Sequence, residues 1–168
     1  LAKYVVILAE KVFIKGYDKS WHVIAKTASK HEPTNIAGQH GDNYLLWIDE
    51  AAGVDDAIME VVLNSLTHDD NRCVMTSQPA RNAGFFYDSH HKLSREAGGV
   101  WNTLILNGEY SPLVKPKILQ EALERYGGRD SPQYMVRIRG LFPDLANEFL
   151  ITNSQFDAAY KVHPLLLS

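Results

Sequence analysis

Two adjacent acidic residues, Asp49 and Glu50, follow the apolar run at residues 44–48, and this order of residue types suits phosphoryl transfer. In motors that hydrolyse nucleotides, an aspartate at the carboxyl end of a buried strand helps to hold Mg²⁺ beside the phosphates. Successive residues of a strand point in different directions, so the adjacent glutamate can polarise an attacking water. The same acidic pair also suits the N-terminal cap of a helix, because a carboxylate accepts hydrogen bonds from the first free N–H groups. These two residues alone do not distinguish the catalytic interpretation from the helix cap.

A second group of polar side chains, Thr76, Ser77 and Gln78, follows the apolar run at residues 73–75. In an open parallel sheet, ligands bind outside the carboxyl ends of the strands. We therefore expect this group to face the same crevice as Asp49 and Glu50. The alternative is a turn imposed by the proline at position 79, with the polar side chains bonded to its backbone.

These side chains need a sheet to position them, and the apolar pattern predicts one. Residues 44–48 form a near-continuous apolar run, which is typical of a strand buried on both faces of a parallel sheet. Trp47 and Cys73 are accordingly predicted to lie in the core. The expected fold is α/β, with a mostly parallel sheet flanked by helices. Strands are expected at 22–27, 44–48, 72–76 and 100–106, and helices at 1–14, 55–66, 84–93, 115–126 and from 131 onward.

Length and composition bound the class of protein. The chain has 168 residues, 45% of them hydrophobic and 22% charged, which predicts one ordinary globular domain. Its net charge of −3 combines an acidic middle with basic flanks, so we expect separate surfaces for cations and anions. The single cysteine excludes an internal disulfide, and no apolar run reaches the ~18 residues of a membrane span. Because the chain begins at Leu1 inside an apolar-periodic stretch, we expect it to be a fragment.

Several motifs, taken in order, resemble the large terminase subunit of tailed phages, the ATP-driven motor that packages DNA into procapsids. Residues 45–51 (Leu-Leu-Trp-Ile-Asp-Glu-Ala) are similar to the Walker B motif of that family. Residues 76–81 (Thr-Ser-Gln-Pro-Ala-Arg) are similar to its ATPase coupling motif. The resemblance runs from about residue 21 to about residue 160, and the further similar segments are 36–41, 84–88, 126–127, 131–134 and 140–144.

The resemblance implies a P-loop NTPase-like fold and a role for each matching residue. Asp49 would hold Mg²⁺ at the ATP site, and Glu50 would activate the attacking water. Thr76 and Gln78 would sense the nucleotide and pass its state to the parts that grip DNA. Arg81, which follows the coupling motif, could reach a phosphate across a subunit interface as arginine fingers do, or could be a surface arginine. The family usually has Asn where Gln78 stands.

The resemblance also implies cofactors and partners. Mg²⁺ and ATP would bind the parent protein, and ATP hydrolysis would drive translocation of double-stranded DNA. The small terminase subunit and the portal would be protein partners, and the parent would assemble as a homo-oligomeric ring. These events would take place in the cytoplasm of the infected bacterium, with no membrane involved.

The sequence lacks a G-x-x-x-x-G-K-[ST] phosphate loop, whose amides and lysine hold nucleotide phosphates. The resemblance therefore assigns residues 1–145 to the C-terminal part of an ATPase domain. It assigns residues 146–168 to the start of the linker towards a nuclease domain that is missing here. We expect an incomplete sheet without the phosphate-loop strand, and no ATPase activity from the isolated chain.

Two other classes of function remain open. A metal-dependent hydrolase would combine Asp49 and Glu50 with a histidine. His40 could approach a phosphate or satisfy a turn, whereas the adjacent His90 and His91 diverge on a helix and share one metal poorly. Alternatively, a non-catalytic fragment could contact nucleic acid or neighbouring subunits. It would make these contacts through the basic ends of the chain, residues 1–30 and 111–140. In the second of these, the residues that could touch a DNA backbone are Lys115, Lys117, Arg125, Arg129, Arg137 and Arg139.

Overall fold

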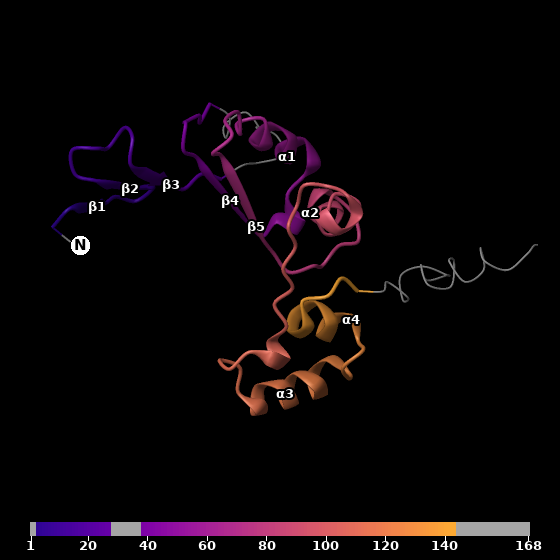
Figure 1. Cartoon of the computed structure of the whole chain (residues 1–168). Coiled ribbons are helices and arrows are strands. Elements are labelled where there is room, and N and C mark those ends of the chain that lie inside the picture. Colours follow the sequence, from indigo (N-terminus) through magenta and orange to yellow (C-terminus); the bar gives the residue numbers. More distant parts are fainter. Residues whose placement is uncertain (1–2, 28–37, 144–168) are drawn as a thin grey trace, which may run out of the picture. The chain divides into compact units, whose positions relative to one another are not determined.

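The computed structural model describes residues 3–27 and 38–143 (Figure 1). The chain divides into two compact units, and the boundary falls within two strands, β4 (Leu45–Asp49) and β5 (Arg72–Thr76). Among the described residues, the first unit comprises 3–27, 38–46 and 55–73, and the second comprises 47–54 and 74–143. No helix in these ranges is long and apolar enough to cross a membrane. The expected domain boundary at residues 145–146 lies outside the described residues.

Three short strands at the start of the chain form an antiparallel sheet. These are β1 (Val5–Ile7), β2 (Lys11–Ile14) and β3 (His22–Ile24), in the order β1-β2-β3. The helix predicted over 1–14 is therefore wrong. Apolar residues recur there at helical spacing, but the β-branched residues Val5 to Ile7, Val12 and Ile14 favour the strands that form. The strand predicted near 22–27 is confirmed, although it pairs antiparallel with β2 and is not part of a parallel sheet.

β4 and β5 lie side by side and run parallel, as predicted (Figure 1). At their start, the N–H of Arg72 donates to the carbonyl of Tyr44. At their end, the Thr76 hydroxyl bonds to the Asp49 carboxylate. The two strands thus start together and end together, as parallel strands do. Two strands in the described residues replace the four that the sequence predicted for this sheet.

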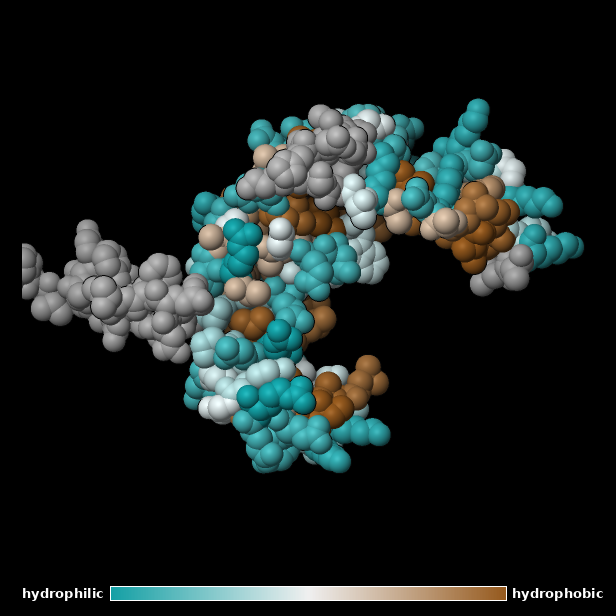
Figure 2. Space-filling view, turned by 180° about the vertical axis from the view of Figure 1, so that it is seen from behind, coloured by the Kyte–Doolittle hydropathy of each residue, from teal (hydrophilic) through white to brown (hydrophobic). Residues whose placement is uncertain are grey.

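The predictions for the apolar runs 44–48 and 100–106 need correction. In β4, Leu46 is buried, but Leu45 and Trp47 are 59% and 65% exposed, so the strand is not covered on both faces. The prediction that Trp47 lies in the core was therefore wrong. Residues 100–106 form no strand beyond a bridge between Trp101 and Ser94. Their leucines remain exposed, and the brown areas of Figure 2 mark exposed apolar surface of this kind.

The helices follow the sequence prediction more closely. The N-cap of α1 (Asp56–Leu63) is Asp55, whose carboxylate accepts from the Ala57 N–H, and the helix buries Ile58, Met59 and Val62. In the second unit, the predicted helices are present as α2 (Phe85–His90), α3 (Pro116–Tyr126) and α4 (Pro132–Tyr134). A π-helix, η5 (Met135–Arg139), follows α4, and 3-10 turns lie at η2 (Ala51–Gly53), η3 (Arg95–Ala97) and η4 (Gly108–Tyr110).

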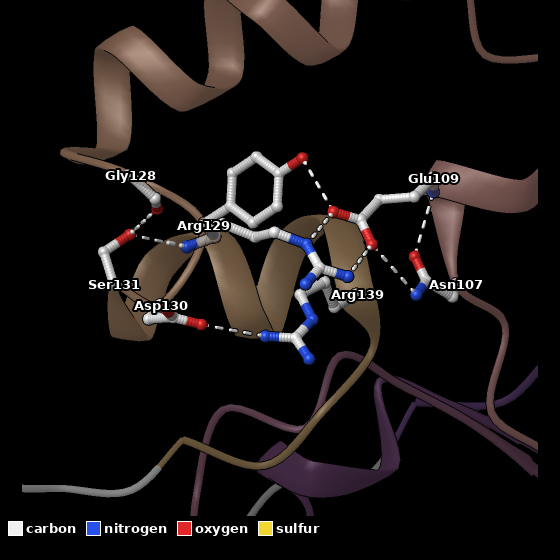
Figure 3. A network of polar contacts seen from close by, with 8 residues as sticks. Asn107, Glu109, Gly128, Arg129, Asp130, Ser131 and Arg139 are labelled. Carbon is white, nitrogen blue, oxygen red and sulfur yellow. Dashed lines mark hydrogen bonds and ion pairs between the residues drawn. The ribbon is translucent and has the colours of Figure 1, made fainter.

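Glu109 links η4 to the segment around α4 (Figure 3). Its carboxylate accepts two hydrogen bonds from Arg129, at 2.7 and 2.8 Å, and one from the buried Tyr134 hydroxyl at 3.2 Å. Asn107 donates a further, longer bond to the same carboxylate. The Arg129 bonds, above all, lower the pKa of Glu109 to about 2. The charged form of Glu109 therefore holds these segments together.

The last described residues fold back onto α2. The Asn82 side-chain amide donates to the Pro143 carbonyl at 2.7 Å. The ring of Phe142 contacts those of four α2 and C-cap residues, Phe86, Tyr87, His90 and His91. These contacts give the paired histidines a packing role against Phe142.

The contacts of Glu109 predict that the free energy of unfolding of the chain decreases at acidic pH. The pKa of Glu109 is lower in the folded state than its usual value of 4.5. Its stabilisation is therefore present above about pH 4.5 and is lost as the pH falls towards about 2. We expect Glu109→Gln to remove this part of the pH dependence and to lower the midpoint of thermal unfolding at neutral pH by a few degrees. Urea unfolding at a series of pH values measures the difference.

The matched control is Glu121→Gln, because Glu121 forms a longer, exposed ion pair with Lys117 at 3.8 Å. This variant should keep the parent's pH profile. If Glu109→Gln also keeps that profile, the ionised carboxylate does not stabilise the fold.

Candidate functional site

The end of β4 and the end of β5 meet through one hydrogen bond. The Thr76 Oγ1 donates to the Asp49 Oδ1 at 2.8 Å. The same Thr76 Oγ1 accepts from the Trp47 Nε1 at 3.1 Å. The structure therefore brings together the two polar strand ends that the sequence predicted would lie near each other. All of these residues belong to the second unit.

Glu50 has an unusual backbone. Its φ of 52° and ψ of 40° lie in the left-handed region, and it is the single non-glycine residue with positive φ in the described part of the chain. For an L-residue this conformation costs about 1–2 kcal/mol, and strain of this kind is often found at functional sites. The conformation ends β4 abruptly and changes the direction of the chain between Asp49 and η2.

The helix-cap interpretation of the acidic pair is not supported. Glu50 precedes η2, but its side chain makes no capping hydrogen bond, and it is exposed. The carboxylate of Asp49 is bonded to Thr76. Asp55 supplies the cap of the following helix, α1. The two acidic side chains are thus left available for another role.

Both backbone polar groups of Ala52, two residues beyond Glu50, bond to side chains of the segment after β5. Its N–H donates to the Ser77 Oγ at 3.1 Å, and its carbonyl accepts from the Arg81 guanidinium at 3.3 Å. η2 also contacts α2. These contacts fix the turn that contains the strained residue, and they explain how its backbone conformation is maintained.

None of the other residues considered for the site makes a hydrogen bond to Asp49 or Glu50 among the described residues. Gln78 is exposed, and so is Arg81 apart from its bond to η2. His40 is exposed and belongs to the first unit, whereas Asp49 belongs to the second. Burial raises the pKa of the Cys73 thiol to about 11, so this cysteine is un-ionised at neutral pH and does not suit nucleophilic chemistry.

Two residues of the site were missed as such in the sequence. Trp47 was predicted to pack in the core, yet its indole N–H bonds to Thr76. Ser77 was grouped with the polar strand end, but its contact with Ala52 was not predicted. The position of Trp47 in the sequence could have indicated its role, because residues two apart on a strand lie on the same face. Trp47 and Asp49 have that spacing.

The residues fit Mg²⁺ in a limited way. This ion usually keeps several waters and binds through one or two carboxylates together with substrate phosphates. Asp49, with Glu50 beside it, offers that number of carboxylates. Within residues 3–27 and 38–143, no group of three or more histidine, cysteine or acidic side chains is placed to hold a metal ion. A hydrolase site built from Asp49, Glu50 and a histidine is therefore not found in these ranges.

The site is thus a parallel strand pair with an aspartate and a strained glutamate at its carboxyl end. Comparison with known proteins identifies a similar protein. The chain is 41% identical over 163 residues to a protein named "Probable terminase, large subunit" from Enterobacteria phage P7. The match covers 95% of this chain and 33% of the phage protein. The resemblance to the large terminase subunit is confirmed, and the chain corresponds to about one third of such a protein.

No protein-family model matches the chain, and no solved structure matches it either. The P-loop NTPase-like fold therefore stays a prediction, which the parallel pairing of β4 and β5 fits.

The strained backbone of Glu50 gives a stability test that does not depend on function. Glycine enters the left-handed region without a Cβ clash. We expect Glu50→Gly to be more stable than Glu50→Ala by about 1 kcal/mol, measured by urea unfolding of the chain.

Glu60 is the matched control, because it is exposed within α1. There Glu60→Gly should be less stable than Glu60→Ala by about 1 kcal/mol. The same order of stability at both positions would show that Glu50 is not strained.

Proposed function

We propose that this chain takes part in ATP hydrolysis for phage DNA packaging, as the Walker B and coupling segment of a terminase large subunit. The observation that carries the proposal is the backbone of Glu50. It is held in a left-handed conformation immediately after Asp49, with its side chain free of any capping bond. The similarity to the phage P7 protein supports the same function.

The proposal gives the two carboxylates different tasks. Asp49 would hold Mg²⁺, with one oxygen already bonded to Thr76. When bound, this ion would neutralise charge on the nucleotide phosphates. Glu50 would act as the base that orients and activates water, which needs a carboxylate directed away from the Asp49 side chain. The change of backbone direction at Glu50 supports that separation.

Thr76, Gln78 and Arg81 are proposed as the residues that respond to nucleotide. Thr76 bonds to Asp49 itself, and Arg81 bonds to the carbonyl of Ala52, which is two residues beyond Glu50. A change at the acidic pair could therefore be transmitted to the segment after β5. Double-stranded DNA, the small terminase subunit, the portal and a homo-oligomeric ring belong to this proposal for the longer protein, acting in the infected bacterium.

The alternative, a non-catalytic fragment that binds nucleic acid through its basic residues, has less support. Three of the six basic residues considered for that role form ion pairs within the chain. Arg129 pairs with Glu109, Arg139 with Asp130 and Lys117 with Glu121. Each such pair reduces the positive charge available to a phosphate backbone.

The isolated chain tests the requirement for a phosphate loop. Most nucleotide-binding free energy in such proteins comes from backbone amides and a lysine around the phosphates. We expect no measurable ATP turnover, and nucleotide binding no tighter than about millimolar. Isothermal titration calorimetry measures the affinity. Micromolar binding of ATP would mean that the chain carries a phosphate site of its own.

The tasks of the acidic pair are separable in a large terminase polypeptide that contains this chain and a phosphate loop. Asp49→Asn removes charge beside the metal, so it should weaken Mg²⁺–ATP binding as well as turnover. Glu50→Gln keeps shape but loses basicity, so turnover should fall by roughly 10²–10⁴ while ATP stays bound. Steady-state hydrolysis and filter binding of labelled ATP measure both quantities. Near-parental hydrolysis by Glu50→Gln would contradict the catalytic role.

A further inference from the structure

The Trp47 side chain is largely exposed, yet its indole N–H bonds to another side chain of the protein. The residue is 65% exposed on β4, so burial in a core does not account for a tryptophan at this position. Its indole N–H nevertheless donates to the Thr76 hydroxyl at 3.1 Å. An exposed indole N–H can bond to water at little cost, so the protein acceptor calls for a structural reason.

The chemistry of the three groups fixes the direction of their hydrogen bonds. An indole nitrogen can only donate, and a carboxylate can only accept. Thr76 therefore accepts from Trp47 and gives its single hydroxyl proton to Asp49, at 2.8 Å. The hydroxyl has no freedom to rotate towards another acceptor without breaking one of the two bonds.

The strands account for this alignment. Trp47 and Asp49 are two residues apart on β4, so their side chains share one face of the strand. Thr76 ends β5, the neighbouring strand, and bonds to both. The Trp47 indole and the Asp49 carboxylate are thus neighbours on one face of β4, and Thr76 on the adjacent strand bonds to both.

We propose that Trp47 is a positioning residue for Asp49, acting through Thr76. The indole N–H sets the rotation of the Thr76 hydroxyl, and the hydroxyl holds Oδ1 of Asp49. The second carboxylate oxygen, Oδ2, takes no hydrogen bond from the described residues and is the one left for a ligand. This inference rests on the proposed function of Asp49, and it adds a residue outside the acidic pair to that site.

The first experiment tests the linkage itself in the chain as it stands, without nucleotide. The sequence has three tryptophans, which give three indole N–H signals in a ¹H–¹⁵N NMR spectrum. Thr76→Val removes the acceptor and should shift the Trp47 signal, while those of Trp21 and Trp101 stay in place. Thr76→Ser keeps the hydroxyl and should leave all three near their original positions. A Trp47 signal that ignores Thr76→Val would overturn the proposal.

The second experiment tests positioning in a large terminase polypeptide that contains this chain and a phosphate loop. Trp47→Phe keeps a ring but removes the donor. We expect the Mg²⁺ concentration for half-maximal ATP hydrolysis to rise by roughly 3- to 10-fold, less than the roughly 10- to 100-fold typical of losing a partner of a metal ligand, because this site is exposed. The maximal rate should fall much less. A residue that served only to stabilise the fold would lower the amount of active protein without changing the Mg²⁺ dependence.

Trp21→Phe is the matched control, because Trp21 is 67% exposed and lies in the first unit. It should leave the Mg²⁺ dependence unchanged. If Trp47→Phe behaves like Trp21→Phe while Asp49→Asn abolishes binding, the positioning role is wrong and the proposed function stands. If Asp49→Asn has no effect on Mg²⁺–ATP binding, the proposed function fails, and with it the role of Trp47.

Discussion

The hydrogen bond from Thr76 to Asp49 joins the carboxyl ends of two strands that are 27 residues apart in the sequence. A bond of this kind requires the strands to end at the same level, and therefore to run parallel. It also occupies one oxygen of an exposed carboxylate, which restricts the rotation of that side chain. The parallel pairing of the strands thus allows this contact, and the contact in turn fixes the orientation of the carboxylate at their end. Without it, both groups would bond to water instead.

The backbone conformation of Glu50 depends on that edge being fixed. Glu50 can remain in a left-handed conformation only if its neighbours make the alternative worse. The contacts of Ala52 with Ser77 and Arg81 do so, because relaxing Glu50 to an extended backbone would pull Ala52 away from both partners. The segment after β5 thus supports the strained turn after β4. This arrangement explains physically why polar residues come directly after both strands.

The parts of this arrangement that sequence reasoning could predict are those set by local pattern. The strands at β4 and β5 and the helix that begins after Asp55 are each determined within a few residues. The helix predicted over residues 1–14 failed because its apolar spacing fits a helix while its β-branched residues fit strands, and pairing between strands decided the outcome. The strand predicted at 100–106 failed because a strand needs a partner that no local pattern specifies.

Trp47 shows why the site was harder to predict than its strand. From the sequence, a tryptophan inside an apolar run is most simply a core residue, because burying its large ring removes much apolar area from water. That expectation holds only if another element covers the face of the strand. In β4 the face bearing Leu45 and Trp47 is exposed, so hydrophobic burial does not explain the residue and its one polar atom must be considered instead. That atom bonds to Thr76, which in turn bonds to Asp49, so a residue first assigned to packing is better understood as part of the polar edge.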